Sequence, residues 1–586
     1  MTDIPASDAD VNPKDAVGAP AADAVRDGDE RGAGPRHALS PTARRLVILG
    51  FALSGAAALI YEVAWTRELS LVFSSTVYAV STMLAAFMTG LSIGGWLGGR
   101  RADKSGTDPV RDLATVELGI AITGLMSPIT LRVIPMLQYE VLTVFKPAPL
   151  VFFALQMLLA FVVMLVPTTL MGMTFPLASK ISTTSYSSLG RTVGGLYSAN
   201  TLGAIAGSLG AGFLLIPIFG LRASILFAGA INLVVACLIM AASRKPAIFR
   251  VGAALALVLV IGIGDVALPQ TAVPLSLGTA YRFASYEDYV ATSGAEDVSV
   301  IWAEENAYSR VEVVEEPGTG FRFLVNGSLV EGSNGRGDAP TTSLLSYLPA
   351  AYADKVDDVL VIGLGTGYTS ASALRLPARS VTTVEINPAM REAASYFVGD
   401  TLEGDERWRL VNADARQQLQ VADTNYDIIT SEPSWPLAAA VSPLFTREFF
   451  ELAESRLADG GVFCQWLPGY LLSHEDQAMM VHTVGQVFGN VHVWEVTVDG
   501  AGNGDILVIA CNAKHVDDSE VVRERVAGML AADGLTGVSA QEIPLSEFLG
   551  GASERAALDV NTDDHPLLEF RVPIELVEMV EGLRTP

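Results

Sequence analysis

Two patterns of hydrophobic positions divide the chain. Between Leu46 and Ala267, long apolar stretches recur, each of about the 20 residues that an α-helix needs to cross a bilayer. After residue 295, apolar positions alternate with polar ones or form short runs, as they do in β-strands. The predicted membrane spans are residues 46–64, 75–97, 113–136, 149–171, 193–217, 222–242 and 248–267. The pattern therefore predicts a multi-span α-helical membrane domain followed by a soluble α/β domain.

The amino-acid composition indicates where these parts begin and end. The first 44 residues are rich in Ala, Asp, Pro and Gly and contain almost no large apolar side chains, which predicts a disordered tail. The expected parts are a tail (1–44), a transmembrane helical domain of about seven spans (45–270), a linker with a small β unit (271–340) and a Rossmann-like domain (341–586).

Small residues recur at every fourth position in two spans, which predicts close helix packing in lipid. They are Gly90, Gly94 and Gly98 in the second span, and Gly195, Ala199, Gly203, Gly207 and Ala211 in the fifth. Asn200 and Asn232 also lie inside spans and are interpreted as helix–helix hydrogen-bonding residues.

Charged residues indicate how the spans are oriented. Two loops are basic and are predicted to be cytoplasmic, together with the N-terminus. The basic residues are Arg44, Arg45, Arg100, Arg101, Lys104, Arg111, Arg244, Lys245 and Arg250. Seven spans would place everything after residue 270 outside the cytoplasm, and a miscounted span would place it inside, so both orientations stay open. Tyr61, Glu62 and Arg67, at the end of the first span, are either an interfacial anchor or a functional site.

The second half begins with a small β unit. Residues 295–332 alternate as strands do, with turn sequences at 317–320 (Pro-Gly-Thr-Gly) and at Asn326-Gly327. Beyond Asp357, strands and helices alternate, which predicts a mostly parallel sheet. Its further strands are expected at Trp408–Val411, Tyr426–Ser431, Gly461–Trp466, His492–Glu495 and Asp505–Cys511.

The strand Val359–Ile362 is followed by the most informative motif of the chain. Glycines come directly after it, at Gly363, Gly365 and Gly367, and a helical stretch follows. A second strand ends in Glu385, about 20 residues further on, as in nucleotide-binding folds. Glycines let the backbone approach a ligand, and the acid can accept hydrogen bonds from ribose hydroxyls. The motif therefore predicts a site for an adenosine-type ligand.

Two more acids follow predicted strands, where ligands bind in such sheets. Asp414, in the run Asn412-Ala-Asp-Ala415, is placed to accept a hydrogen bond from an adenine amine. Glu432 ends an apolar strand and is expected to face the reactive end of the ligand. Asp427 starts the same strand and is expected to lie away from the ligand edge.

The net charge of −26 argues against nucleic-acid binding, which needs a basic surface. The three cysteines lie in apolar runs without shared spacing, and the six histidines are scattered, so no metal site is predicted.

Taken together, these motifs resemble the membrane-fused branch of the spermidine synthase (polyamine aminopropyltransferase) family. The resemblance covers most of the chain. The runs that carry it are SGAAALIYEVAWTREL (54–69), GRTVGGLYSANTLGAIAGSLGAGFLLIPIFGLR (190–222), GLGTGYT, VEINP, NADAR, YDIITSEPSWP, LFTREFFELAESRLADGGVFCQW and NTDDHPLLEF. The resemblance implies a Rossmann-like domain of the S-adenosylmethionine-transferase type and transfer of an aminopropyl group from decarboxylated S-adenosylmethionine to a diamine.

The resemblance also assigns roles to residues of this chain. The donor-binding positions implied are Gly363, Gly365, Thr366, Gly367, Glu385, Asp414 and Ala415, and Glu432 matches the catalytic acid. The sequence departs from the family at Thr366 and Trp435, where the family carries acids, and at Ala415, where it carries Gly. The missing acids leave putrescine specificity open, and also the choice between decarboxylated and ordinary S-adenosylmethionine.

Three functions follow from these observations. The first is a membrane-bound aminopropyltransferase that acts on an amine such as putrescine, with Glu432 as base or amine anchor, located in the inner membrane. The second is an S-adenosylmethionine-dependent methyltransferase with a hydrophobic acceptor, which Trp435 and Pro436 would suit. The third is a transporter with a nucleotide-sensing domain, to which Glu62 could contribute. The expected partners are a small amine and the lipid bilayer, and a homo-oligomer is left open.

Overall fold

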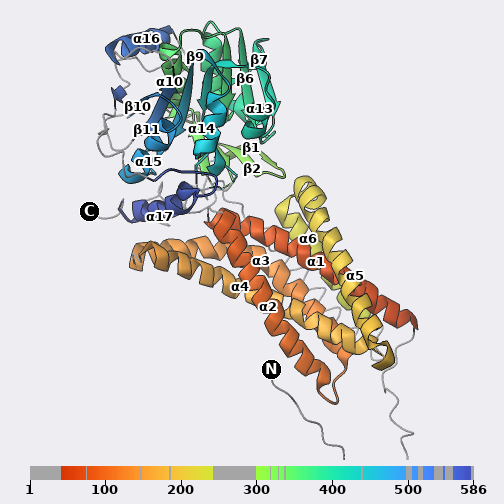
Figure 1. Ribbon diagram of the computed structural model, residues 1–586. Helices are drawn as coiled ribbons and strands as arrows, with labels where there is room; N and C mark the ends of the chain where they lie inside the picture. The colour runs from red at the N-terminus through yellow and green to blue at the C-terminus, as the bar shows by residue number, and fades with distance from the viewer. Residues whose placement is uncertain are drawn as a thin grey trace, which may run out of the picture.

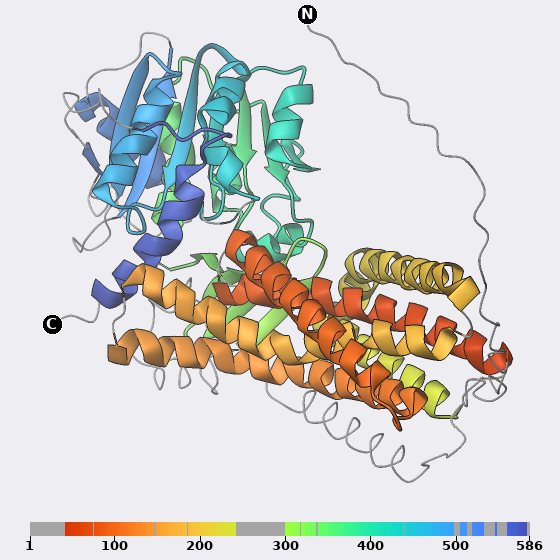
Figure 2. The ribbon, with the colours of Figure 1, turned by 60° about the horizontal axis from the view of Figure 1, so that its bottom comes forward.

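The structure is a computed structural model with an N-terminal helix bundle and a C-terminal α/β domain set on one end of it (Figures 1 and 2). It describes residues 41–73, 76–145, 148–183, 186–241, 299–316, 318–327, 329–335, 338–436, 438, 440–496, 504–512, 519–532, 545–547 and 559–582. Of the expected tail, only residues 41–44 are described, and they form the first turn of a helix.

The bundle consists of long apolar helices. They are α1 (Pro41–Phe73), α2 (Thr76–Asp103), α3 (Pro109–Phe145), α4 (Pro149–Ser182), η1 (Tyr186–Ser188), α5 (Leu189–Gly210), the π-helical turn η2 (Ala211–Leu215) and α6 (Ile216–Ala241). Five stretches of the described residues are long and apolar enough to cross a membrane. The fifth, Leu189–Met240, comprises two of the predicted spans, which separate at Gly220, where φ is +80°. The predicted span 248–267 lies outside the described residues.

Small residues let the helices approach closely. A Cβ atom added to Gly94 would lie 2.0 Å from the backbone oxygen of Thr169 on α4, and one added to Gly203 would lie 1.9 Å from that of Ala52 on α1. Gly90, Gly98 and Gly207 pack in the same way, so these positions fulfil the prediction. Gly195 meets nothing within 4 Å, and its place in the predicted stripe was therefore wrong. The Asn232 amide donates to Glu117 Oε2 at 2.8 Å, as expected of a helix–helix hydrogen bond.

The C-terminal half begins with the predicted β unit, an antiparallel sheet ordered β1-β2-β3-β4. Its strands are β1 (Ser299–Glu305), β2 (Arg310–Glu316), β3 (Phe321–Asn326) and β4 (Leu329–Ser333). Gly318, Gly320 and Gly327 have positive φ at its turns, which explains the glycines of the predicted turn sequences.

The larger sheet has the order β12-β10-β11-β9-β8-β5-β6-β7. Its strands are β5 (Asp358–Ile362), β6 (Ser380–Glu385), β7 (Trp408–Asn412), β8 (Tyr426–Ser431), β9 (Leu457–Leu467), β10 (Asn490–Val496), β11 (Asp505–Cys511) and β12 (Leu545–Glu547). Strands β5 to β9 pair in parallel, whereas β11 pairs antiparallel with β9 and β10, and β12 antiparallel with β10. The sheet is therefore parallel only on one side, and this difference from the prediction affects the site.

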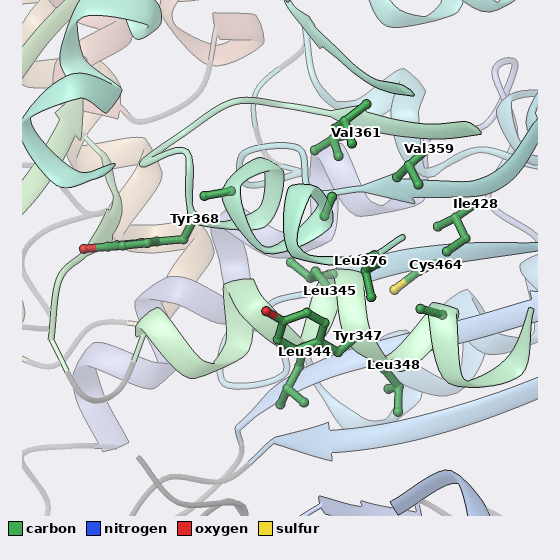
Figure 3. Packing of buried hydrophobic residues seen from close by; sticks show 14 of the residues in the cluster. Leu344, Leu345, Tyr347, Leu348, Val359, Val361, Tyr368, Leu376, Ile428 and Cys464 are labelled. Carbon is green, nitrogen blue, oxygen red and sulfur yellow. The ribbon is translucent and has the colours of Figure 1, made fainter. Parts of the chain in front are cut away.

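Helices cover both faces of this sheet, and its central strands are therefore buried on both sides. On β5, Val359 and Val361 face one hydrophobic cluster, and Leu360 and Ile362 face the other. The first cluster contains α10 (Asp338–Tyr352), α11 (Tyr368–Arg375), α12 (Met390–Val398) and α16 (Ser519–Ala532), and the second contains α13 (Ala415–Val421), α14 (Arg447–Glu454) and α15 (His474–Gly485). Figure 3 shows Leu344 and Leu348 of α10 in the first of these clusters, near Ile428 and Cys464 of the sheet.

The domain contacts the bundle near both ends of its described sequence. The last helix, α17 (Leu567–Gly582), packs on α3 and α4, and its buried side chains belong to the same hydrophobic cluster as Phe152 and Phe153 of α4. The turn between β1 and β2 contacts the other side of the bundle, where Arg67 of α1 donates to the backbone oxygen of Asn306 at 2.7 Å. The domain is thus attached at both the beginning and the end of its sequence.

Candidate active site

The glycine loop leads from β5 into α11 and is packed against the next strand of the sheet. Gly363 has φ of +93°, and a Cβ atom there would lie 2.4 Å from the backbone oxygen of Glu432. Gly367 has φ of +84° and precedes α11, where a side chain would crowd α12. Gly365, with φ of +50°, has open space around its Cβ position. Thr366 is buried. The loop thus needs glycine for its backbone at three positions and for close packing at two.

Glu385 stands at the carboxyl end of β6 and holds this loop. Its Oε2 accepts a hydrogen bond from the Leu364 amide at 3.0 Å, and its Oε1 accepts one from the Asn387 amide at 2.8 Å. Burial raises the pKa of Glu385, and the backbone amides partly offset that effect because they stabilise the carboxylate. The acid is therefore fixed beside the loop, where the sequence predicts that it binds a ribose.

Asp414 follows β7 and has a structural role as well. It is the N-cap of α13, and its Oδ1 accepts a hydrogen bond from the Gln417 amide at 2.9 Å. Ala415 is buried against the core. Both predicted residues lie at the same edge of the sheet as Glu385, since Asn412 of β7 pairs with Glu385 of β6. Adenine binding by Asp414 remains a prediction.

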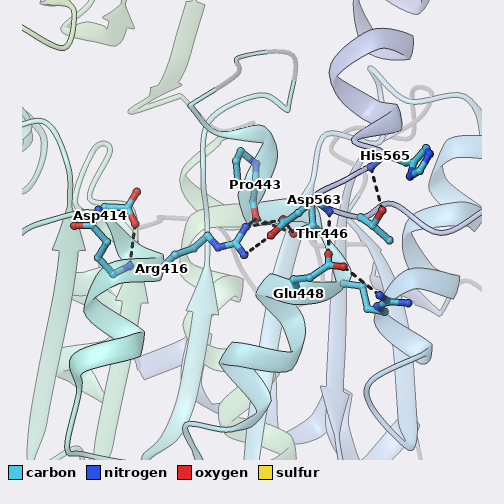
Figure 4. Close-up of polar contacts among 10 residues, drawn as sticks. Asp414, Arg416, Pro443, Thr446, Glu448, Asp563 and His565 are labelled. Carbon is cyan, nitrogen blue, oxygen red and sulfur yellow. Dashed lines mark hydrogen bonds and ion pairs between the residues drawn. The ribbon is translucent and has the colours of Figure 1, made fainter.

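A segment near the C-terminus is attached beside Asp414 (Figure 4). Nη1 and Nη2 of Arg416 each donate to the Asp563 carboxylate at 2.7 Å, and the Thr446 hydroxyl donates to the same carboxylate at 2.7 Å. The Asp563 amide donates to Glu448 Oε2 at 2.9 Å. The Arg416 guanidinium lowers the pKa of Asp563, chiefly through these hydrogen bonds. The NTDDHPLLEF motif therefore fixes the C-terminal segment to the helix that Asp414 caps.

Glu432 comes directly after β8 and lies next to the glycine loop. Its amide donates to the backbone oxygen of Ile362 at 2.9 Å, so the strand pairing continues up to this residue. Its carboxylate accepts a hydrogen bond from the Thr369 hydroxyl of α11 at 2.5 Å. Burial, together with the negative charges of Asp505, Glu331 and Asp338, raises the pKa of Glu432 to about 8, although the Thr369 hydrogen bond partly offsets the effect. Asp427, at the other end of β8, accepts from the amides of residues 357 and 358, away from this site as predicted.

The sequence did not predict the three acids whose charges raise the pKa of Glu432 as site residues. Together with Glu432, they form the acid cluster (Glu331, Asp338, Glu432 and Asp505). Glu331 lies on β4 and accepts hydrogen bonds from Ser434 at 2.7 Å and Asn326 at 3.0 Å, and burial raises its pKa to about 7. Asp505 starts β11 and accepts from Trp466 Nε1 at 3.0 Å, and burial raises its pKa to about 6.

The chemistry of this cluster favours a cationic ligand. No ion pair among the described residues involves Glu331, Glu432 or Asp505, so these carboxyl groups lack a cationic partner within the described parts of the domain. Nor do three His, Cys, Asp or Glu side chains converge tightly enough there to hold a metal ion. A bound amine would supply the positive charge and the N–H donors that these carboxylates can accept. Trp435 is buried in the hydrophobic core, where it packs edge-on against Tyr470, and so offers no exposed surface to an apolar acceptor.

The chain is similar to known polyamine aminopropyltransferases. Residues 339–520 match the family model described as the spermine/spermidine synthase domain. Polyamine aminopropyltransferase 1 of Streptomyces coelicolor is 27% identical over 439 residues, which cover 72% of this chain and 76% of that protein. A polyamine aminopropyltransferase of Oceanobacillus iheyensis is 24% identical over 475 residues, 79% of this chain and 85% of that protein. These alignments are too long for the C-terminal domain alone and extend into the helix bundle.

Two further similarities concern the C-terminal domain. Putrescine N-methyltransferase 1 of Nicotiana tabacum is 28% identical over 212 residues, 35% of this chain and 56% of that protein. Among solved structures, a probable spermidine synthase from Corynebacterium glutamicum has 14% identity and a TM-score of 0.34, over 45% of this chain and 96% of that one. A TM-score this low adds nothing to the sheet topology described above.

Proposed function

We propose that this chain, which belongs to the spermine/spermidine synthase family of transferases through its residues 339–520, is a membrane-bound polyamine aminopropyltransferase. An amine such as putrescine would attack the aminopropyl carbon of decarboxylated S-adenosylmethionine. The N–C bond forms as the C–S bond of the sulfonium breaks, a proton leaves the nitrogen, and 5′-methylthioadenosine departs. The observation that supports this function is the acid cluster beside the glycine loop and Glu385.

Each part of the site has a role in this reaction. The glycine loop and Glu385 hold the adenosine part of the donor, with Asp414 at the adenine side. Glu331 and Asp505 replace the acids that the family carries at the positions of Thr366 and Trp435, and they anchor the cationic amine. Once the bound cationic amine has ionised it, Glu432 accepts the proton of the attacking nitrogen. Burial, which raises the pKa of Glu432 to about 8 in the ligand-free site, makes its carboxylate a stronger base than an ordinary one. Fixing both substrates in line supplies much of the rate.

Mass spectrometry of the product tests the proposal directly. The purified full-length protein, in detergent or nanodiscs, should convert putrescine and decarboxylated S-adenosylmethionine to spermidine. Removing the base in Glu432→Gln should lower kcat by about 10² to 10⁴-fold and leave donor binding nearly unchanged. The matched control is Glu403→Gln, which removes an exposed acid paired with Arg391 on the surface. Full activity of Glu432→Gln would exclude Glu432 as the base.

Methyl transfer is the second candidate function. Thr366 stands where the family carries an acid, so this chain lacks one source of repulsion against the carboxylate of ordinary S-adenosylmethionine. The similarity to a putrescine N-methyltransferase points to the same amine as acceptor. The same assay with ordinary S-adenosylmethionine separates the two, because methyl and aminopropyl groups add different masses to putrescine.

We also propose an orientation in the membrane from the distribution of basic residues. Arg45 lies near the start of α1, and Arg67, towards its other end, contacts the C-terminal domain. Arg101, at the end of α2, pairs with Asp112 at the start of α3, at the bundle end away from that domain. On the positive-inside rule the basic end faces the cytoplasm, so we place the C-terminal domain on the opposite side of the inner membrane. Fusion of alkaline phosphatase or green fluorescent protein to the C-terminus tests this, because the phosphatase is active only outside the cytoplasm.

A further inference from the structure

A chain of hydrogen bonds connects the helix bundle to the donor-binding acid. Arg67 of α1 donates to the backbone oxygen of Asn306, in the turn between β1 and β2, at 2.7 Å. The Asn306 side-chain amide donates to Asn387 Oδ1 at 2.7 Å, and the Asn387 backbone amide donates to Glu385 Oε1 at 2.8 Å. Glu385 in turn accepts from Leu364 in the glycine loop. Four consecutive contacts therefore link a bundle helix to the donor loop.

A second branch leads from the same turn to the acceptor side. The Asn387 side-chain amide donates to the Ser309 hydroxyl at 2.8 Å, and that hydroxyl donates to Asn326 Oδ1. The Asn326 amide donates to Glu331 Oε1 at 3.0 Å, which places the end of this branch in the acid cluster. Each side chain along the branch accepts from one neighbour and donates to the next, so the amide orientations agree with one another.

The turn itself is held in shape by Asn306. Its Oδ1 accepts hydrogen bonds from the amides of Tyr308 at 3.0 Å and Ser309 at 3.3 Å, and this fixes the backbone that Arg67 contacts. Asn387 is buried, and its hydrogen bonds are therefore shielded from competition with water. A displacement of the turn by the bundle would move Asn387 and, through it, both branches.

We infer that the β1–β2 turn couples the packing of the helix bundle to both substrate subsites, with Arg67, Asn306, Asn387 and Ser309 as positioning residues. The inference rests on the proposed function in so far as it names donor and acceptor subsites. It gives the bundle a role beyond anchoring: the site is fully ordered only when α1 is in place. Both branches pass through the hydrogen bond between Asn306 and Asn387, so changes at the turn should affect both subsites.

The neighbouring Glu305 provides a matched control. Its Oε2 accepts from the Leu221 amide at 3.4 Å, directly after the break at Gly220 in α6. This is a contact between the bundle and β1 itself. The Glu305 carboxylate also acts electrostatically on Arg67, but it is not a member of either hydrogen-bonded branch. Glu305→Ala therefore weakens attachment to the bundle without cutting the path to Glu385 or Glu331.

Steady-state kinetics of the full-length protein in nanodiscs, with decarboxylated S-adenosylmethionine and putrescine, separates the branches. We expect Asn306→Ala and Arg67→Ala to raise the KM of both substrates by about threefold to tenfold, the cost of one lost hydrogen bond. Ser309→Ala should raise only the KM of putrescine. Arg67→Lys, which keeps a donor to the Asn306 oxygen, should restore most of the affinity, and Glu305→Ala should change neither KM. Unchanged KM values in both Asn306→Ala and Arg67→Ala would refute the coupling, as would a fall in kcat alone.

Hydrogen exchange gives a readout that does not depend on the substrates. In the ligand-free protein, Arg67→Ala and Asn306→Ala should speed exchange of the glycine loop, because Glu385 holds the Leu364 amide. Exchange in β10, near the far edge of the sheet, should stay as in the unaltered protein. If the wild-type protein binds neither substrate but the loop still responds to these variants, the proposed function fails while the coupling stands. If the loop does not respond, the coupling fails whatever the protein binds.

Discussion

Binding of a diamine should expel protons from the acid cluster, and this can be measured. Without a ligand, burial raises the pKa of Glu432 to about 8, that of Glu331 to about 7 and that of Asp505 to about 6. Near neutral pH, Glu432 is therefore mostly protonated and Glu331 about half protonated. A dication that enters the cluster favours the ionised carboxylates, and their protons leave to solvent.

The size of the effect follows from these values. At about pH 7, the three groups together hold about one and a half protons, so binding one putrescine should release about one proton or slightly more. At about pH 9 the groups are already ionised, and release should approach zero. Calorimetric titration in two buffers of different ionisation enthalpy, with 5′-methylthioadenosine present to fill the donor site, gives the number of protons directly.

Two variants sharpen this prediction. Glu432→Gln removes the most strongly protonated group, and release at about pH 7 should fall by most of one proton while weak binding persists. Glu403→Gln, on the surface, should leave release unchanged. If putrescine binds at about pH 7 without proton release, or if release is the same at pH 7 and pH 9, the acids do not face the amine and the reasoning fails.

Further predictions concern stability and the loop. Gly363→Ala should lower the melting temperature and abolish donor binding, since positive φ costs about 1–2 kcal/mol and its Cβ would overlap a backbone oxygen, whereas Gly365→Ala, in open space, should show only the cost of its φ. Arg416→Ala should lower unfolding free energy by about 1 kcal/mol, because the pair with Asp563 is partly exposed, and should speed proteolysis of the C-terminal segment. The ligand-free protein should lose stability as pH rises from about 5 to about 8, because the raised pKa of Glu432 means that the folded state binds the proton more tightly than the unfolded one. Thermal unfolding across this range checks the slope, and Glu432→Gln should flatten it.

The sequence predicted the parts of the site that follow parallel strands. Glu385 ends β6, Glu432 directly follows β8, and Asp414 follows β7 after Ala413. Residues at these positions reach the carboxyl edge of a parallel sheet. The glycine loop was also predicted, because its three glycines stand where the backbone has positive φ, a conformation that few other residues adopt. These features depend on neighbours in the chain, and a single sequence therefore reveals them.

Glu331 and Asp505 could not be found in that way. Asp505 begins its strand, and it reaches the same edge only because β11 runs antiparallel to β9, so that its first residue lies where a parallel strand would end. Glu331 lies in an alternating strand of the small β unit and looks like an ordinary solvent-facing acid. Its position beside Ser434 results from how the small sheet packs on the large one. Such long-range placement leaves no local pattern in the sequence.

The shared hydrophobic cluster at the junction has a consequence for how the protein is made. Leu568, Val572 and Leu576 of α17 are buried in one cluster with Phe152 and Phe153 of α4. During synthesis α4 is made long before α17, so this shared cluster can be completed only after α17 has left the ribosome. A ribosome stalled shortly before residue 567 would therefore leave a folded bundle with an unfinished enzyme beside it.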